Sequence, residues 1–185
     1  MVVHVFVLGV DPGLSRCGYC ALAVDRRGSR PVALGVISTP PDAPVPARLA
    51  ELQREFRALF DEVRPSVVAV ERVLFQVNVR TAMGVGQASG VVMAEAAGRG
   101  CEVVEYSPNQ VKEAITGSGN ADKDQVGMMV ATLLGLASPP RPADAADAAA
   151  IALCHVAFAP LRAARARAEA LAPAVTGPLH AGARR

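Results

Sequence analysis

The chain has 185 residues, 51% of them hydrophobic, and a formal net charge of +2, which indicates one domain with a terminal extension. It contains no run of 18 apolar residues, and its first residues lack the basic segment and cleavage site of a signal peptide, so a cytoplasmic protein without membrane contact is expected. Residues 161–185 carry five arginines and one glutamate, whereas the rest is slightly acidic, so the composition permits a nucleic-acid partner without requiring one.

Three short, closely spaced apolar segments open the chain and predict an antiparallel meander of strands. We place these strands at about residues 3–10, 17–24 and 31–38. Apolar residues at helical spacing then predict a helix over about 46–63, with one face formed by Leu49, Leu52, Phe56, Leu59 and Phe60.

The second half of the chain alternates strands and helices. Strands are predicted at about 66–71 and 101–106, and between them a helix that begins near Asn78 and ends near Gly98. Further helices are predicted at about 108–115, 122–135 and 143–160. The fold class is therefore α/β: residues 1–160 form a five-stranded mixed sheet, three antiparallel strands followed by two α-connected strands, flanked by helices. The basic tail, residues 161–185, has few bulky apolar side chains and is predicted to be largely disordered.

Cys17 and Cys20 have the C-x-x-C spacing of redox and zinc sites. However, both fall on a predicted strand, where an offset of three residues puts two side chains on opposite faces. No second C-x-x-C or paired histidine follows. We therefore expect all four cysteines to be ordinary reduced thiols.

Four acids stand beside apolar segments on three separate elements. Asp11 follows a buried strand and precedes a Pro-Gly turn, and Glu71 ends another apolar strand. Asp144 and Asp147, three residues apart, share one face at the start of an Ala-rich helix. Each has a simpler explanation alone, since acids favour turns and first helical turns, but four together predict one site for a hard cation.

Oxygen ligands without a competing histidine or cysteine cluster favour Mg²⁺ or Mn²⁺. Two such ions about 3.5–4 Å apart can activate a water and stabilise the leaving oxygen of a phosphodiester. The four acids therefore predict a metal-dependent nuclease.

The sequence also resembles the RuvC family of Holliday-junction resolvases. The similarity extends over about residues 4–158, with the blocks in order: Val7–Tyr19, Val70–Val73, Gly86–Gly90, Gln110–Lys112, Ala121–Lys123 and Ala143–Ala148. This resemblance implies an RNase H-like fold, a homodimer, and symmetric nicking of four-way junction DNA with Mg²⁺ or Mn²⁺. It also implies that Asp11, Glu71, Asp144 and Asp147 are the catalytic metal ligands, and that the RuvA and RuvB branch-migration proteins are partners.

The family's basic residues near the scissile phosphate fall on Lys112 and Lys123, which are the only two lysines in the chain. Lys123 follows a Gly-rich loop and opens a predicted helix, a placement suited to an anion, although surface lysines are usually just solvated. The family commonly has a base-stacking aromatic three residues after the glutamate. Here that position is Leu74, and Phe75 follows, so either residue is expected to contact DNA.

A stripe of small residues, Ala82, Gly86, Gly90 and Ala94, repeats every fourth position in the second predicted helix. Because glycine inside a helix costs about 1 kcal/mol relative to alanine, the stripe predicts close approach of another backbone. That backbone belongs either to the chain's own sheet or to a dimer partner, and the resemblance favours the dimer.

Three other functions remain open at this stage. An actin-like or sugar-kinase nucleotide binder also opens with a strand, an acid and a glycine turn, but usually needs two related domains. Another RNase H-like nuclease would use the same acids, although the Gln110–Lys112 and Ala121–Lys123 blocks favour the resolvase. A junction-binding protein without nuclease activity would not need four acids. Metal-dependent cleavage of a four-way junction separates all of these.

Overall fold

The structure, a computed structural model, describes residues 5–73 and 79–171. Its centre is a five-stranded sheet of order β3-β2-β1-β4-β5, in which β1–β2 and β2–β3 pair antiparallel and β1–β4 and β4–β5 pair parallel. The strands are β1 (Val5–Asp11), β2 (Arg16–Asp25), β3 (Gly28–Ser38), β4 (Val67–Glu71) and β5 (Glu102–Tyr106). The predicted mixed sheet is confirmed, and this topology is the RNase H-like arrangement that the resemblance implies.

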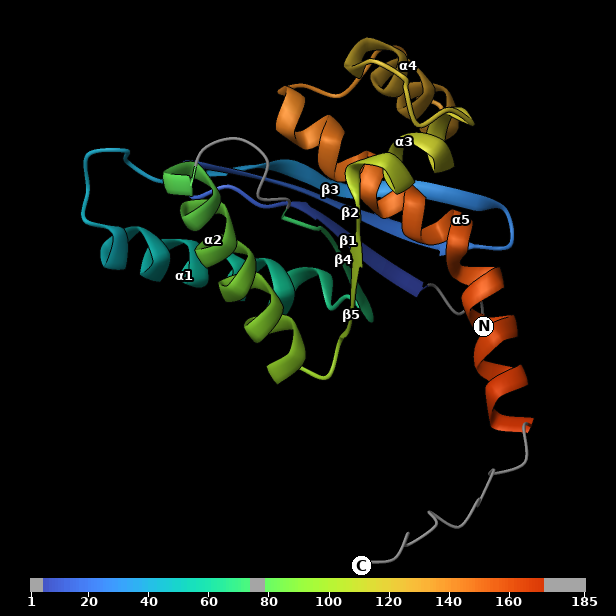
Figure 1. The fold of residues 1–185 in the computed structure, drawn as a ribbon, viewed down its shortest axis with the longest axis horizontal. Helices are drawn as coiled ribbons and strands as arrows, with labels where there is room; N and C mark the ends of the chain where they lie inside the picture. Colours follow the sequence, from blue (N-terminus) through green and yellow to red (C-terminus); the bar gives the residue numbers. More distant parts are fainter. Residues whose placement is uncertain (1–4, 74–78, 172–185) are drawn as a thin grey trace, which may run out of the picture.

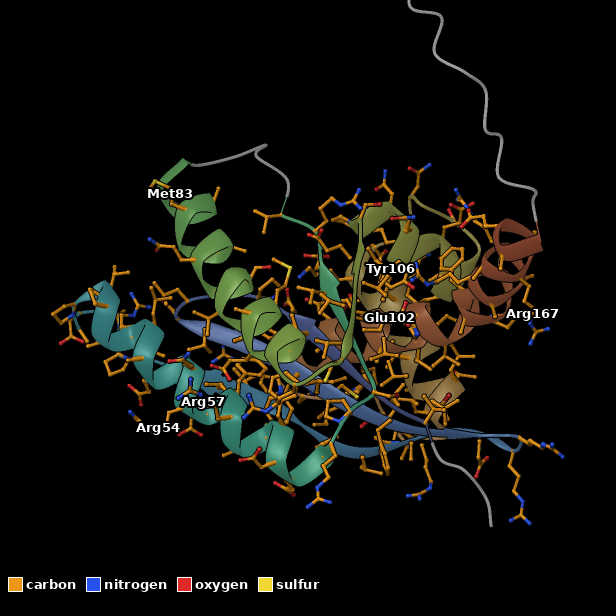
Figure 2. All side chains as sticks on the ribbon, turned by 90° about the horizontal axis from the view of Figure 1, so that it is seen from below. Arg54, Arg57, Met83, Glu102, Tyr106 and Arg167 are labelled. Carbon is orange, nitrogen blue, oxygen red and sulfur yellow. The ribbon has the colours of Figure 1, made fainter. Side chains whose placement is uncertain are left out.

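In the part of the chain that the structure describes, five helices cover the two faces of the sheet (Figure 1). They are α1 (Val45–Val63), α2 (Val79–Gly98), α3 (Pro108–Thr116), α4 (Lys123–Leu134) and α5 (Ala143–Leu171). Helices α1 and α2 lie on one face, and α3, α4 and α5 lie on the other. Figure 2 shows the same separation, with Arg54 and Arg57 of α1 far from Arg167 of α5.

Alternation along the strands builds a separate hydrophobic core on each face. In β1, Val7 faces the core under α5, whereas Leu8 and Val10 face the core under α1 and α2. Cys17 and Cys20 likewise lie in different cores, which confirms the prediction that their side chains point to opposite faces. All four cysteines are free thiols.

Helix α5 is longer than predicted. It continues from Ala143 to Leu171, so residues 161–171 are helical and the prediction of a disordered tail is wrong for that part. Alanine and arginine are strong helix formers, and the chain continues past Pro160 with an exposed Arg165–Glu169 pair one turn apart. An ion pair from Arg162 to Glu102 of β5 also ties the extension to the sheet.

By length and composition alone, residues Ala143–Ala170 could cross a membrane. However, 56% of the most apolar window of this helix is buried inside the protein. Its apolar character is that of a core helix, because its alanines pack against the sheet.

The small-residue stripe of α2 is not covered by the chain's own sheet. Gly86, Gly90 and Ala94 are exposed, and a Cβ atom built on either glycine would meet nothing within 4 Å. This excludes the first of the two explanations for the stripe. The predicted N-cap Asn78 and the predicted DNA contacts Leu74 and Phe75 lie outside the described residues.

Candidate active site

Two of the four acids meet because their strands are parallel neighbours. Val10 of β1 pairs with Val70 of β4, so the next residues, Asp11 and Glu71, end adjacent strands at the same edge of the sheet. The carboxyl ends of parallel strands are where α/β folds place their ligands. Both side chains are partly buried.

Two glycines allow α5 to bring the other two acids to this edge. A Cβ atom on Gly9 would come within 2.2 Å of the Ala148 carbonyl oxygen, and one on Gly18 within 2.0 Å of the Asp144 carbonyl oxygen. Gly18 is also the residue that pairs with Asp11 across β1 and β2. The first turn of α5 therefore lies directly against the strand pair that carries Asp11.

The Ala-rich sequence at the start of α5 sorts its side chains between core and site. Ala145 and Ala148 are fully buried against the sheet, whereas the side chains of Asp144 and Asp147 are each 31% exposed. The spacing of three residues keeps both acids on one face, as predicted. The structure thus brings all four predicted acids to one edge of the sheet.

Burial and mutual repulsion both act on the two strand acids. The pKa of Asp11 is raised from 3.8 to about 7, first by burial and then by repulsion from Glu71, Asp147 and Asp144. The pKa of Glu71 is also raised, mainly by burial and then by the Asp147 charge. A buried carboxyl among three others favours either a proton or a cation.

Two basic side chains partly compensate this charge, both by pairing with the helix acids. The Lys123 ammonium donates to Asp147 Oδ2 at 2.9 Å, and this hydrogen bond is the main cause of a raised lysine pKa. The Arg16 guanidinium donates to Asp144 Oδ2 through Nε at 2.8 Å, and Nη2 lies 2.7 Å from the same oxygen. Among the described residues, no basic side chain forms an ion pair with Asp11 or Glu71.

The position of Lys123 follows from a local helix signal. Asp122 is the N-cap of α4, and Asp122 and Gln125 form a reciprocal capping box. Lys123 is therefore fixed as the first residue of α4, next to Asp147. Lys112, by contrast, is half-buried on α3, and none of the ion pairs in the described part of the chain joins it to the acids.

The donor set fits a hard divalent cation. Every acid offers carboxylate oxygens, and the pKa of Asp11 is raised first by burial and then by the three neighbouring acids, whose effect Lys123 only partly offsets. Within residues 5–73 and 79–171, no three acid, histidine or cysteine side chains are already arranged around one point. Instead Asp144 and Asp147 face Arg16 and Lys123, so a cation that used these acids would compete with both pairs.

Sequence reasoning missed Arg16, Gly9 and Gly18. Both glycines and Arg16 lie in the block around Asp11, but nothing in the local pattern says which helix packs there. A glycine inside each of two neighbouring strands, Gly9 in β1 and Gly18 in β2, is the one signal of a close helix approach.

Comparison with known proteins gives this site its class. The family model described as "Crossover junction endodeoxyribonuclease RuvC" matches residues 7–155. The chain belongs to this family, whose nucleases are metal-dependent.

Relatives and solved structures agree with that assignment. Crossover junction endodeoxyribonuclease RuvC of Rhodococcus jostii is 52% identical over 169 residues, which cover 90% of this chain and 88% of the relative. The Thermus thermophilus RuvC structure has a TM-score of 0.79 and 36% identity, covering 85% of this chain and 96% of that one. The T. thermophilus RuvC in complex with Holliday junction substrate has a TM-score of 0.77 and 35% identity, with the same coverage.

Proposed function

We propose that this chain is a metal-dependent endodeoxyribonuclease that resolves four-way DNA junctions by paired symmetric nicks, in recombination and repair. The observation that carries the proposal is the convergence of Asp11, Glu71, Asp144 and Asp147 at one sheet edge, in a member of the RuvC family. The similar T. thermophilus protein has a structure in complex with a Holliday junction, which supports the same substrate here.

The four acids are the proposed ligands for Mg²⁺, with Mn²⁺ as a substitute and two ions per site. When bound, these ions supply Lewis-acid polarisation of the phosphodiester and lower the pKa of water. The protein's own part is to present oxygen ligands on rigid elements: two strand ends and the first turn of a helix. Such a placement fixes the carboxylates before substrate arrives.

Lys123 is proposed to contact a phosphate near the cut. Its ammonium lies 2.9 Å from Asp147 Oδ2, so a phosphate held by it would lie beside the acids. Lys112 keeps the phosphate-contact role implied by the family. Leu74 or Phe75 is proposed to contact a base at the junction centre.

We propose that a second copy of the chain packs against the α2 stripe and forms a homodimer. Gly86 and Gly90 leave open space beyond their Cα atoms, and Met83 of the same helix is 58% exposed. Figure 2 shows Met83 near the amino end of α2, which lies on the opposite face of the sheet from α5. A dimer would supply two active sites, as two symmetric nicks require.

The remaining partners and the location follow from family membership. RuvA and RuvB are the proposed protein partners. A cytoplasmic location suits four free thiols, because reducing compartments keep cysteines unpaired.

The deciding experiment is incubation of the protein with a synthetic four-way junction, with Mg²⁺ and with chelator. Symmetric nicks in opposing strands that require Mg²⁺ would support the proposal. Binding without cleavage would favour a junction-binding protein, and equal cleavage of linear duplex would favour a general nuclease. Asp11→Asn is the control, because it should bind the junction without cutting it.

A further inference from the structure

The contact between Arg16 and Asp144 joins residues 128 positions apart in the sequence. Two nitrogens of the guanidinium, Nε and Nη2, lie 2.8 and 2.7 Å from the same oxygen, Asp144 Oδ2. Although this contact is close, the Arg16 side chain remains 51% exposed. Arg16 therefore reaches solvent while it binds one oxygen of a carboxylate that belongs to the proposed cation site.

The turn directly before Arg16 is held by a buried network. Arg48 of α1 is 8% exposed, and it donates through Nη2 to Ser15 Oγ at 2.6 Å and through Nε to Thr39 Oγ1 at 2.9 Å. Thr39 in turn donates its backbone N–H to the Ser15 carbonyl oxygen at 3.1 Å and its hydroxyl to the Leu14 carbonyl oxygen at 2.6 Å. The backbone directly before Arg16 is thus fixed from two sides, which holds Arg16 at the carboxyl end of β1.

The charges around Asp144 set up a competition. A divalent cation at the four acids and the Arg16 guanidinium both draw on the negative charge of the Asp144 carboxylate, so one weakens the binding of the other. A DNA phosphate at the same edge offers Arg16 an alternative partner. Guanidinium groups bind phosphate through two parallel hydrogen bonds, which makes arginine better suited to this exchange than lysine.

We propose that Arg16 shields Asp144 in the free protein and transfers its guanidinium to a DNA phosphate when the junction binds. The transfer releases Asp144 for the cation, so DNA raises the affinity for metal and metal raises the affinity for DNA by the same factor. Arg16 is a positioning residue for the substrate and a competitor of the metal. The inference rests on the proposed function, since it requires DNA and a divalent cation at this edge of the sheet.

The first test measures Mn²⁺ binding to the protein without DNA, by electron paramagnetic resonance of the free ion. Arg16→Ala should bind Mn²⁺ about 2- to 5-fold more tightly than the parent, because an exposed ion pair no longer competes. Arg16→Lys should stay close to the parent. Arg26→Ala is the matched control: it removes one arginine from the exposed turn at the other end of β2 and should leave the affinity unchanged.

The second test measures junction binding in chelator as a function of salt. Log affinity falls with log salt concentration, and loss of one phosphate contact in Arg16→Ala should make this slope about 0.9 less steep. The slope for Arg26→Ala should equal that of the parent. If Arg16 had a purely structural role, Arg16→Ala would weaken both metal and DNA binding. Shielding predicts instead that Arg16→Ala binds metal more tightly and DNA more weakly.

Two results would overturn the proposal. Unchanged or weaker Mn²⁺ binding by Arg16→Ala would exclude shielding, and an unchanged salt slope would exclude the phosphate contact. A melting curve of each variant shows that it is folded. Arg16→Gln, which removes the charge but keeps a long polar side chain, should also bind Mn²⁺ more tightly than the parent and replaces the alanine variant if that one is unfolded. Failure of the proposed function looks different, because the parent protein itself would then leave the junction uncut in Mg²⁺.

Discussion

Gly18 lies so close to Asp144 that a Cβ atom on the glycine would come within 2.0 Å of the aspartate's carbonyl oxygen. The contact joins β2 to the first turn of α5, and Gly18 also pairs with Asp11. One hydrogen atom in place of a side chain therefore decides how near the helix acids lie to the strand acids. Packing on this face of the sheet and the geometry of the site are set by the same position.

Substitution of this glycine should damage stability and catalysis together. Gly18→Ala must push α5 away from the sheet, at a cost of about 3 kcal/mol, since the clash is with backbone and not with a flexible side chain. Thermal melting and junction cleavage measure the two losses. The control is Gly98→Ala at the end of α2, where a Cβ meets nothing within 4 Å. If Gly18→Ala had the melting temperature and the junction cleavage rate of the parent, the close contact between β2 and α5 would be contradicted.

The raised pKa of Asp11 predicts a pH-dependent stability in metal-free protein. Below about pH 4 the carboxyl is protonated in both the folded and the unfolded state, so it has no effect. Between pH 4 and 7 the unfolded state loses the proton while the folded state keeps it, because the folded pKa is about 7. The folded state is therefore destabilised progressively over this range, and the penalty is constant above it, at most about 4 kcal/mol.

Asp11→Asn removes this penalty, so its advantage in melting temperature over the parent should grow from pH 4 to pH 7 and then level off. The measurement is a series of melting curves in chelator. Asp42→Asn, in the exposed loop before α1, is the control and should show no such trend. A constant difference between Asp11→Asn and the parent at all pH values would show that neither burial nor the neighbouring acids raise the pKa of Asp11 in the folded protein.

The two lysines should differ in their effect on cleavage. Lys123→Ala removes the cation beside Asp147 and should slow cleavage about 10- to 100-fold, because charge stabilisation at a reacting phosphate is a large term. Junction affinity should fall much less, since one phosphate contact is a small part of the interface. Lys112→Ala should slow cleavage less, because Lys112 has no ion pair with the acids. The measurement is the single-turnover rate of junction cleavage for each variant. Equal rates for both variants and the parent would show that neither lysine has a catalytic role.

The exposed stripe of α2 predicts the assembly. Gly90→Leu should leave the monomer fold intact, because no atom of the described residues outside the helix's own backbone lies within 4 Å of a Cβ there. The leucine side chain should disrupt the dimer. Light scattering gives the mass, and Gly98→Leu on the same helix is the control. If Gly90→Leu is still a dimer, the stripe does not form the interface.

The sequence allowed the strand ends to be predicted because the relevant signals are local. Asp11 and Glu71 each close an apolar run, and period-two alternation places Cys17 and Cys20 on opposite faces. The Arg16–Asp144 pair could not be predicted in this way, because it depends on how a helix at the end of the domain crosses a strand at its beginning. The same holds for Gly18, whose importance appears only once α5 lies above it.

The tail was predicted wrongly for a different physical reason. The sparse bulky residues between Leu161 and Leu171 indicate little packing, and the prediction equated little packing with disorder. A helix already anchored in the core needs no new nucleus, so each further alanine or arginine extends it at little cost. Arg162 then gains a partner in Glu102, which lies 60 residues away in sequence.

The length of α5 limits what its arginines can do. From Asp147 to Arg165 the helix rises about 27 Å, or the length of about eight base pairs along a duplex. At physiological salt the field of a solvated charge is largely screened beyond about 8 Å, so the arginines at this end cannot act on the bond that is cut. Any DNA phosphate that they contact would lie most of a helical turn of duplex away from the proposed cleavage site. If these arginines do bind the junction, removal of their charge would shorten the time that the junction stays bound and leave the cleavage step itself unaltered.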